Sequence, residues 1–220
     1  MDCSICSYCM NILTTLTCLF VVRMWIVYLR IHNNKRTIPR AKTPSVKTMV
    51  VLGSGGHTFE MFQLIKNISN KFSPRIYIIA NSDTLSECKA KSFEESLDNL
   101  PENYVIERIP RSREVAQSYI TSVLTTLKAS IFSFLLICRH MPDCLICNGP
   151  GTCVPLCLSA FLLHSLGLKH IKTIYVESIC RVSTLSLSGK ILYHLTDYFI
   201  VQWPDIRKKY PHAKYFGRLI

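Results

Sequence analysis

An almost uncharged run over residues 5–29 dictates the structure of the N-terminus. About 20 apolar residues cross a lipid bilayer as a helix, and Arg23, the one charge in the run, can extend to the interface. A cleaved signal peptide is the alternative, but such peptides usually begin with basic residues. This chain begins with Asp2 and carries its positive charges later. We therefore expect a transmembrane anchor at residues 5–29, behind a short lumenal segment at residues 1–4.

The charge of the chain is concentrated around the end of this anchor. The 220 residues include 26 Lys and Arg against 14 Asp and Glu, a net charge of +12, and no acidic residue lies between Asp2 and Glu60. Cytosolic flanks of membrane helices are rich in Lys and Arg, so we expect the following domain in the cytosol. Seven basic residues supply more than half of the excess: Arg23, Arg30, Lys35, Arg36, Arg40, Lys42 and Lys47.

This concentration of charge bears on the partners of the chain. The linker at residues 30–46 would favour anionic lipid headgroups, and the alternative is that its charges only set the topology. Because so much of the basic excess lies beside the membrane, the main argument for nucleic-acid binding is lost. We expect a membrane partner and no nucleic acid.

The chain has eleven cysteines, most of them within apolar runs. We expect them to be reduced on the cytosolic side and to behave as small apolar side chains. Cys144 and Cys147 have the spacing of a zinc-ligand pair but lie in an expected strand without a second pair. Cys3, Cys6 and Cys9 also lack a fourth ligand. We therefore expect neither a metal nor a cofactor.

Short apolar runs alternate with helical patterns from Lys47 to the end of the chain. This alternation predicts a Rossmann-like α/β domain over residues 47–220, with a mostly parallel sheet covered by helices on both faces. Residues 129–138 are nearly all apolar, and we expect a core helix there, with insertion into the membrane surface as the alternative. The expected strands are 47–52, 75–80, 104–109, 143–148, 171–176 and 198–202, and the expected helices are 57–70, 82–97, 114–139, 152–166, 186–195 and 205–210.

The first loop that could bind a ligand or take part in a reaction is Gly53-Ser54-Gly55-Gly56, which follows the first strand. Ligands of such sheets bind beyond the carboxyl ends of the strands, and a helix N-terminus favours phosphate. The loop lacks the Lys of a nucleotide-binding P-loop, and a plain tight turn is the alternative. His57 follows it and is a candidate general base; a phosphate ligand or a helix cap are its other interpretations.

Two later loops follow strands at the same expected edge of the sheet. Asn148-Gly149-Pro150-Gly151-Thr152 is a second candidate anion cradle, or else a turn with Thr152 as a helix cap. Glu177 and Arg181 flank a third loop, where a carboxylate and a guanidinium would bind sugar hydroxyls and phosphate, or else pair with each other. The chain has no Asp-x-Asp motif, so we do not expect a metal-dependent sugar-nucleotide site.

Several long segments, in order, together resemble one family. They are Val51–Thr58 (VLGSGGHT), Arg108–Val115 (RIPRSREV), Cys147–Pro155 (CNGPGTCVP), Tyr175–Val182 (YVESICRV), Ser188–Leu192 (SGKIL), Asp197–Pro204 (DYFIVQWP) and Phe216–Leu219 (FGRL). The family is the membrane-anchoring subunit of the UDP-N-acetylglucosamine (UDP-GlcNAc) transferase of dolichol-linked oligosaccharide synthesis. The resemblance covers residues 47–220, and the N-terminal anchor in kind.

The resemblance implies a two-chain enzyme at the cytosolic face of the endoplasmic reticulum. Such an enzyme adds the second GlcNAc to dolichyl-diphosphate-GlcNAc, with UDP-GlcNAc as the donor. The anchor subunit would be the acceptor-side half of a GT-B glycosyltransferase, and a separate catalytic subunit would hold UDP-GlcNAc. The chain length agrees, since only about one domain follows Lys47 and a GT-B cleft needs two. A self-sufficient glycosyltransferase and a purely structural tether are the alternatives.

The resemblance and the loops together give the expected site. His57 and Glu177 are the candidate catalytic residues. The residues expected to bind the acceptor diphosphate are Gly53, Ser54, Gly55, Gly56, His57 and Thr58. Those expected to line the cleft are Asn148, Gly149, Gly151, Thr152, Glu177, Ser178 and Arg181. The C-terminal residues are largely apolar, and those expected to contact the catalytic subunit are Phe216, Gly217, Leu219 and Ile220.

Overall fold

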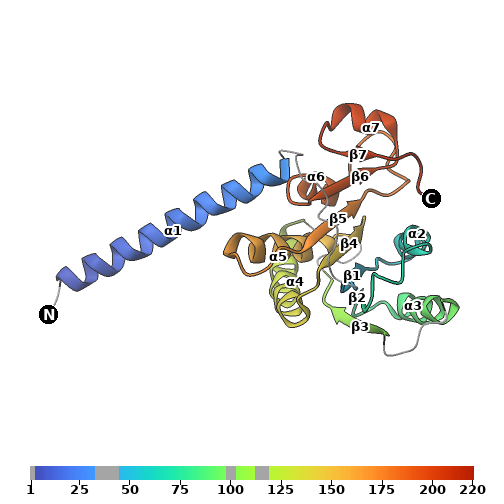
Figure 1. Ribbon diagram of the computed structural model, residues 1–220, viewed down its shortest axis with the longest axis horizontal. Helices are drawn as coiled ribbons and strands as arrows, with labels where there is room; N and C mark the ends of the chain where they lie inside the picture. Colours follow the sequence, from blue (N-terminus) through green and yellow to red (C-terminus); the bar gives the residue numbers. More distant parts are fainter. Residues whose placement is uncertain (1–2, 33–44, 98–102, 112–118) are drawn as a thin grey trace.

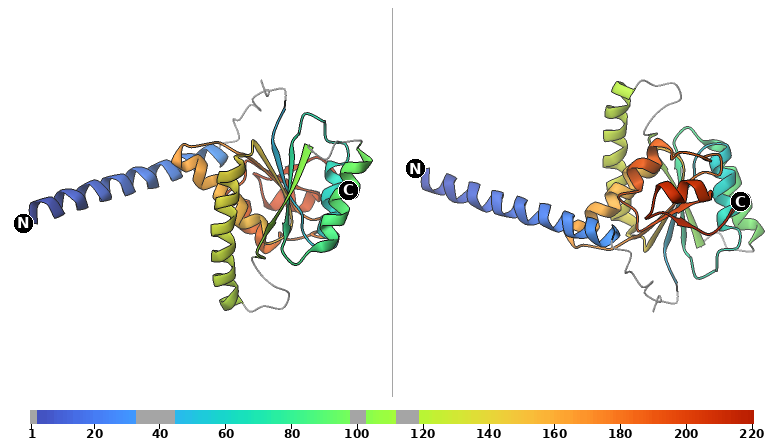
Figure 2. Two further views of the ribbon diagram at one scale, coloured as in Figure 1. Left: turned by 90° about the horizontal axis from the view of Figure 1, so that it is seen from below. Right: turned by 90° about the horizontal axis from the view of Figure 1, so that it is seen from above.

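The computed structural model describes residues 3–32, 45–97, 103–111 and 119–220, and consists of a long N-terminal helix and an α/β domain (Figure 1). The helix, α1 (Cys3–His32), projects away from the domain, which contacts it at its C-terminal end (Figure 2). Its stretch Ser7–His32 is long and apolar enough to cross a membrane. Of the expected linker, residues 33–44 lie outside the described part of the chain.

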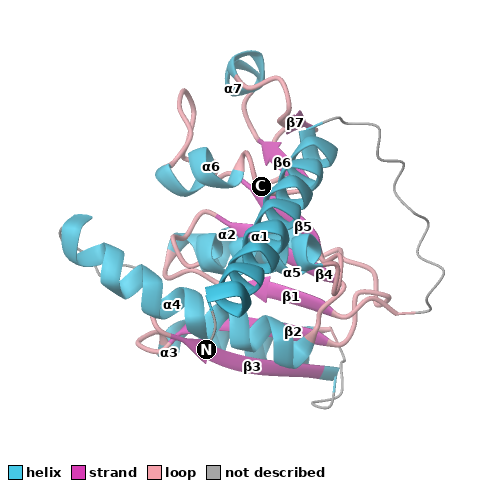
Figure 3. Cartoon of the chain, turned by 90° about the vertical axis from the view of Figure 1, so that its left-hand side faces the viewer, coloured by secondary structure: helices cyan, strands magenta, loops and turns pink. Residues whose placement is uncertain are grey.

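The domain is built on a seven-stranded sheet in which every pair of neighbours is parallel. The spatial order is β3-β2-β1-β4-β5-β6-β7 (Figure 3). This confirms the expected Rossmann-like α/β fold. The strands are β1 (Thr48–Val51), β2 (Arg75–Ala80), β3 (Tyr104–Ile109), β4 (Cys144–Asn148), β5 (Lys172–Val176), β6 (Tyr198–Val201) and β7 (Lys214–Tyr215).

Helices cover both faces of the sheet (Figure 2). The helices are α2 (Gly56–Ile65), α3 (Thr84–Ser96), α4 (Tyr119–His140), α5 (Cys153–Leu166), α6 (Leu187–Leu192) and α7 (Pro204–Lys209). Because successive strand residues point to opposite faces, Val50 packs in the core under α2 and α3, whereas Val51 packs in the core under α4 and α5.

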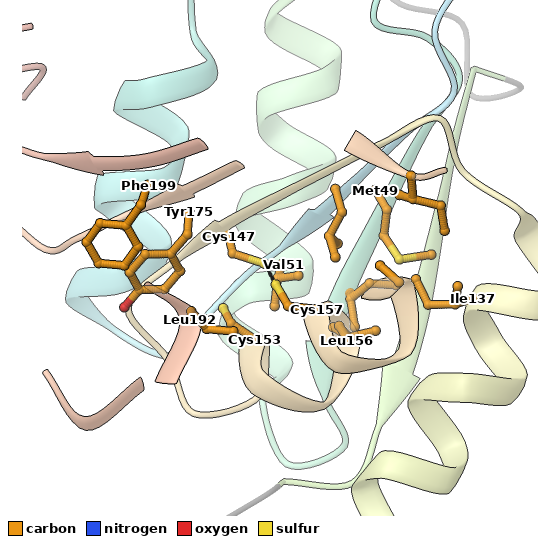
Figure 4. Close-up of a cluster of buried hydrophobic side chains, with 14 of the residues drawn as sticks. Met49, Val51, Ile137, Cys147, Cys153, Leu156, Cys157, Tyr175, Leu192 and Phe199 are labelled. Carbon is orange, nitrogen blue, oxygen red and sulfur yellow. Dashed lines mark hydrogen bonds between the residues drawn. The ribbon is translucent and has the colours of Figure 1, made fainter. Parts of the chain in front are cut away.

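The core under α4 and α5 contains three of the cysteines, Cys147, Cys153 and Cys157, all fully buried (Figure 4). The Sγ atoms of Cys147 and Cys157 are 3.6 Å apart, a distance at which the two thiols share a hydrogen bond but form no disulfide. The structure finds free thiols at all nine cysteines whose side chains it describes. Burial raises the pKa of the Cys147 thiol, which therefore stays protonated and behaves as a small apolar side chain.

Helix α4 has two different faces over the apolar stretch 129–138. Ala129, Ser133 and Ile137 are fully buried against the sheet and α5. Ile131 and Leu135, on the opposite face, remain about three-fifths exposed, at 58% and 61%. The stretch is thus core on one side only, and α4 is the second helix of the described chain that is long and apolar enough to cross a membrane.

The C-terminal end of α1 is docked on the domain. Val27 is only 3% exposed, and the guanidinium of Arg23 lies so close to Gly167 that a Cβ there would be 2.4 Å from its Nη2 atom. The ring of His32 lies against that of His212, with centroids 5.0 Å apart. Helix α1 therefore meets the domain through a packed contact as well as through the chain itself.

A buried ion pair joins β2 to α3. Arg75 donates to both carboxylate oxygens of Glu94, from Nε at 2.6 Å and from Nη2 at 2.7 Å. Both side chains are essentially inaccessible, at 1% and 0% exposure. The hydroxyl of Tyr77, the next inward-facing residue of β2, donates to the same carboxylate. The three side chains thus satisfy one another inside the core.

Candidate functional site

The candidate site lies where the order of the strands changes direction. From β1 the chain proceeds outward to β2 and β3, then returns to the other side of β1 with β4 (Figure 3). In sheets of this kind the crevice beyond the carboxyl ends of two such strands is the usual ligand site. The loops after β1 and β4, which the sequence predicted as functional, therefore come together.

His57 lies between these two loops. A Cβ atom on Gly149 would be 2.5 Å from the Nδ1 atom of His57, so the imidazole occupies the space that a side chain would take. A Cβ on Gly53 would likewise be 2.6 Å from the Cβ of His57. The Nδ1 atom is buried, and no hydrogen-bond partner for it is found in the described part of the chain.

Replacing Gly149 with alanine is expected to destabilise the domain by roughly 1–2 kcal/mol or more. Gly149 has a φ of 73°, and L-residues pay about that much in this left-handed region, before the clash with His57 is added. Chemical denaturation of the purified chain would measure the loss. Gly151→Ala is the matched control, because nothing lies within 4 Å of a Cβ there. Equal stability of the two variants would contradict this prediction.

The glycine loop after β1 is held by buried hydrogen bonds at its start, and its remaining residues are exposed. The hydroxyl of Thr58 donates to the carbonyl of Gly53, and Ser86 of α3 donates to the same carbonyl at 3.0 Å. Thr58 is fully buried, so its side chain holds the loop, and only its backbone remains for the expected phosphate role. Ser54, Gly55 and Gly56 are exposed at the start of α2, where the first N–H groups of a helix have no partner within it.

Asn148 and Ser178 are joined by a residue that the sequence analysis did not select, Glu60. The carboxylate of Glu60 accepts from the Asn148 amide at 3.1 Å and from the Ser178 hydroxyl at 2.7 Å. Glu60 is 6% exposed although it lies on a helix surface. The available signal for a role of Glu60 was its position: it is a charged residue between Thr58 and Met61, on the buried side of α2.

Glu177 is turned inward. It is 1% exposed, and it accepts from the backbone N–H and the hydroxyl of Ser186, both at 3.0 Å, at the start of α6. Burial raises the pKa of this carboxyl group, and these hydrogen bonds oppose the shift. Arg181 is exposed, and the structure records no ion pair between it and Glu177. Any role for Glu177 in a reaction stays a prediction.

The remaining predicted residues divide between the β4 loop and the C-terminal tail. Thr152, at the start of α5, makes no side-chain cap there. In the tail, the N–H of Leu219 donates to the Gln202 side chain at 3.1 Å, and the guanidinium of Arg218 lies over the Trp203 ring, 4.3 Å from its centroid. Phe216 is 66% exposed. The tail is therefore held to the domain, close to α2 (Figures 1 and 2). It leaves the apolar side chain of Phe216 exposed.

Comparison with known proteins gives a consistent picture. The family model described as "Oligosaccharide biosynthesis protein Alg14 like" matches residues 48–219. The UDP-N-acetylglucosamine transferase subunit ALG14 of Homo sapiens is 51% identical over 205 residues, covering 91% of this chain and 92% of the human one. The subunit of the same name from Yarrowia lipolytica is 43% identical over 182 residues, covering 82% of this chain and 84% of its own.

Two solved structures share the fold at low sequence identity. MurG of Acinetobacter baumannii superimposes with a TM-score of 0.51 at 16% identity, over 73% of this chain. A UDP-N-acetylglucosamine 2-epimerase gives a TM-score of 0.53 at 14% identity, over 76% of this chain. The chain spans less than half the length of either protein, 41% and 42%.

Proposed function

Because the chain belongs to the Alg14 family and is a subunit of a UDP-N-acetylglucosamine transferase of oligosaccharide biosynthesis, we propose that it is the membrane-anchored, acceptor-side half of that enzyme. The complex adds the second GlcNAc to dolichyl-diphosphate-GlcNAc. This chain recruits the catalytic subunit and helps to bind the acceptor, while the catalytic subunit holds UDP-GlcNAc. It does not transfer sugar on its own.

The observation that carries this proposal is a candidate ligand crevice formed by the loops of one sheet. The loops after β1 and β4 meet at the switch point of one Rossmann-like sheet, and the chain spans only 41% of the MurG chain that shares its fold. A cleft between two domains needs a second domain, which a partner would supply. That partner would gain a high effective concentration at the membrane once it is bound to this chain.

The anchor and its flank support the membrane part of the proposal. We infer that α1 spans the endoplasmic reticulum membrane once, with the domain on the cytosolic face. The basic residues that follow the span favour this orientation. The lipid-linked acceptor would then reach the site by diffusion within the same membrane, so the enzyme need not extract it into water.

The proposed roles in the transfer fall on the loop after β1 and on the residue that follows it. The exposed turn Ser54–Gly56 and the start of α2 offer N–H groups and a positive dipole to the acceptor diphosphate. His57 takes the proton from the acceptor 4-hydroxyl as its oxygen bonds to C1 of the donor GlcNAc. The bond from C1 to the diphosphate of UDP breaks in the same step, and UDP leaves with the electron pair.

The test is a membrane-based transferase assay. This chain is expressed with and without the catalytic subunit, and the membranes receive UDP-GlcNAc and dolichyl-diphosphate-GlcNAc. We expect transfer only when both chains are present. Transfer by this chain alone would contradict the division of the active site and favour a self-sufficient enzyme, whereas no transfer by the two chains together would contradict the proposed reaction.

Deleting Gly217–Ile220 is expected to abolish recovery of the catalytic subunit with this chain. The deletion removes the hydrogen bond from Leu219 to Gln202 and the stacking of Arg218 on Trp203, so Phe216 loses its fixed position. Copurification from detergent extracts would measure the loss. Leu85→Ser, which changes an apolar side chain 74% exposed on α3, is the control. Full recovery of the complex after the deletion would refute a docking role for the tail.

A further inference from the structure

Glu60 is a buried carboxylate at the centre of the candidate site, and the reaction as described does not use it. It comes from α2, one turn after His57, and its two oxygens accept from different elements. Oε2 accepts from Asn148 at the end of β4, and Oε1 accepts from Ser178 beyond the end of β5. Neither donor is a cation, so these are hydrogen bonds and not ion pairs. Through them the carboxylate connects the helix that carries His57 to the loops after two strands.

The bond to Glu60 fixes the orientation of Asn148. The Nδ2 group of this fully buried amide donates both to Glu60 and to the carbonyl of Val176, at 3.1 and 3.2 Å. A flipped amide would set its oxygen against two acceptors, so only this orientation is satisfied. Oδ1 is then left buried with no partner in the described chain. An unpaired buried acceptor costs stability, and such costs are concentrated at functional sites.

Both bonds act on the residues around His57. Asn148 directly precedes Gly149, whose backbone forms the surface against which the imidazole lies. Ser178 also accepts from the N–H of Cys180 at 3.3 Å, so its hydroxyl fixes the turn after β5. The separation between the start of α2 and these two loops is thus set through one side chain.

We propose that Glu60 is a positioning residue for the transfer reaction. Its carboxylate holds the first turn of α2 and the loops after β4 and β5 in the relative arrangement that aligns His57 with the acceptor. This inference rests on the proposed function, since the acceptor is the ligand that these loops would hold. Glu60 itself does not touch the reacting atoms, because both of its oxygens are bonded inside the protein.

The experiment measures kcat and both KM values of the two-subunit complex in membranes, with dolichyl-diphosphate-GlcNAc and UDP-GlcNAc varied separately. For Glu60→Ala we expect kcat to fall about 100-fold, as misplacement of catalytic groups by about 1 Å can do. The KM for the acceptor should rise, and the KM for UDP-GlcNAc should stay unchanged. A purely structural role would instead lower the amount of complex and leave both KM values as they were.

Two further variants sharpen the result. Glu60→Gln should recover most of the activity, because its amide can accept from Asn148 and donate to the Ser178 oxygen. Ser178→Ala removes one bond to Glu60 and little volume, so it should give the same pattern as Glu60→Ala with a smaller effect. If Glu60→Ala does not fold, the kcat and acceptor KM of Ser178→Ala test the inference in its place.

Asp197→Asn is the matched control. Asp197 is a carboxylate only 4% exposed that joins β5 to β6, where it accepts from the N–H and the hydroxyl of Thr173 at 3.0 and 3.1 Å. It lies at the opposite end of these strands from the site, so the variant should keep both KM values. Wild-type kinetics in Glu60→Ala, or an acceptor KM that rises equally in Asp197→Asn, would overturn the inference. Absence of transfer by the unmodified complex would instead refute the proposed function, and this inference with it.

Discussion

Replacing His57 with alanine is expected to lower the turnover of the two-subunit complex by about 10²- to 10⁴-fold, the usual contribution of a general base. The imidazole lies between the loops after β1 and β4, and in the proposed mechanism it accepts the proton. Its removal would leave the acceptor hydroxyl without a proton acceptor. Assembly should be unaffected, because the proposed docking residues lie in the C-terminal tail.

The measurement is initial-rate transfer per mole of assembled complex, with copurification of the catalytic subunit as the measure of assembly. His140→Ala is the control, since His140, the last residue of α4, is also partly buried but pairs with Glu107 of β3. We expect its turnover to match the wild type. Unchanged turnover in His57→Ala would remove the residue from the mechanism and favour a chain that serves only as a tether.

Replacing Glu94 with alanine is expected to lower the free energy of unfolding by about 3–5 kcal/mol, the cost of leaving one member of a buried ion pair alone. Glu94 raises the pKa of Arg75 by its hydrogen bond, so the guanidinium would stay charged in the core without its counter-charge. Burial raises the pKa of Tyr77 as well, and its neutral hydroxyl would lose its acceptor.

Chemical denaturation of the purified chain would measure this loss. Glu87 lies on the same helix as Glu94, and Glu87→Ala breaks its exposed ion pairs with Lys91 of α3 and Arg108 of β3, so it should change stability little. The triple variant Arg75→Met, Tyr77→Phe, Glu94→Leu should regain much of the loss, because apolar side chains of similar volume can replace a buried ion pair, and the hydroxyl that depends on it is removed as well. A single variant as stable as Glu87→Ala would contradict the prediction.

The strands and the order of elements could be predicted from sequence because the signal is local. All four residues of β1 are buried, as its continuous apolar run indicates. Strand β7 was not predicted, since two residues with one exposed side chain form no pattern. Helix α2 ends at Ile65, earlier than expected, and residues 114–118 of the expected fourth helix lie outside the described residues.

The site could be predicted in its position but not in its connections. The loop at Gly53 can be recognised from its glycines after a buried strand, a signal that does not depend on tertiary contacts. The inward direction of the Thr58 hydroxyl depends on Ser86, which follows 28 residues later. The role of Glu60 depends on β4 lying beside β1, a tertiary fact that no local pattern encodes. The inward direction of Glu177 likewise depends on α6, because its carboxylate accepts from the backbone N–H of Ser186 at the start of that helix.

The attachment of the C-terminal tail to the domain has a thermodynamic consequence. Leu219 donates to Gln202, and Gln202 donates to the carbonyl of Glu177 at 3.1 Å, which is followed directly by Ser178 and its bond to Glu60. The end of the chain and the loops of the candidate site therefore share one network. If the catalytic subunit binds the tail more tightly when acceptor is present, reciprocity requires that it tighten acceptor binding by the same factor. A lone anchor subunit would then be a weak lipid binder, and substrate capture would be cooperative with assembly.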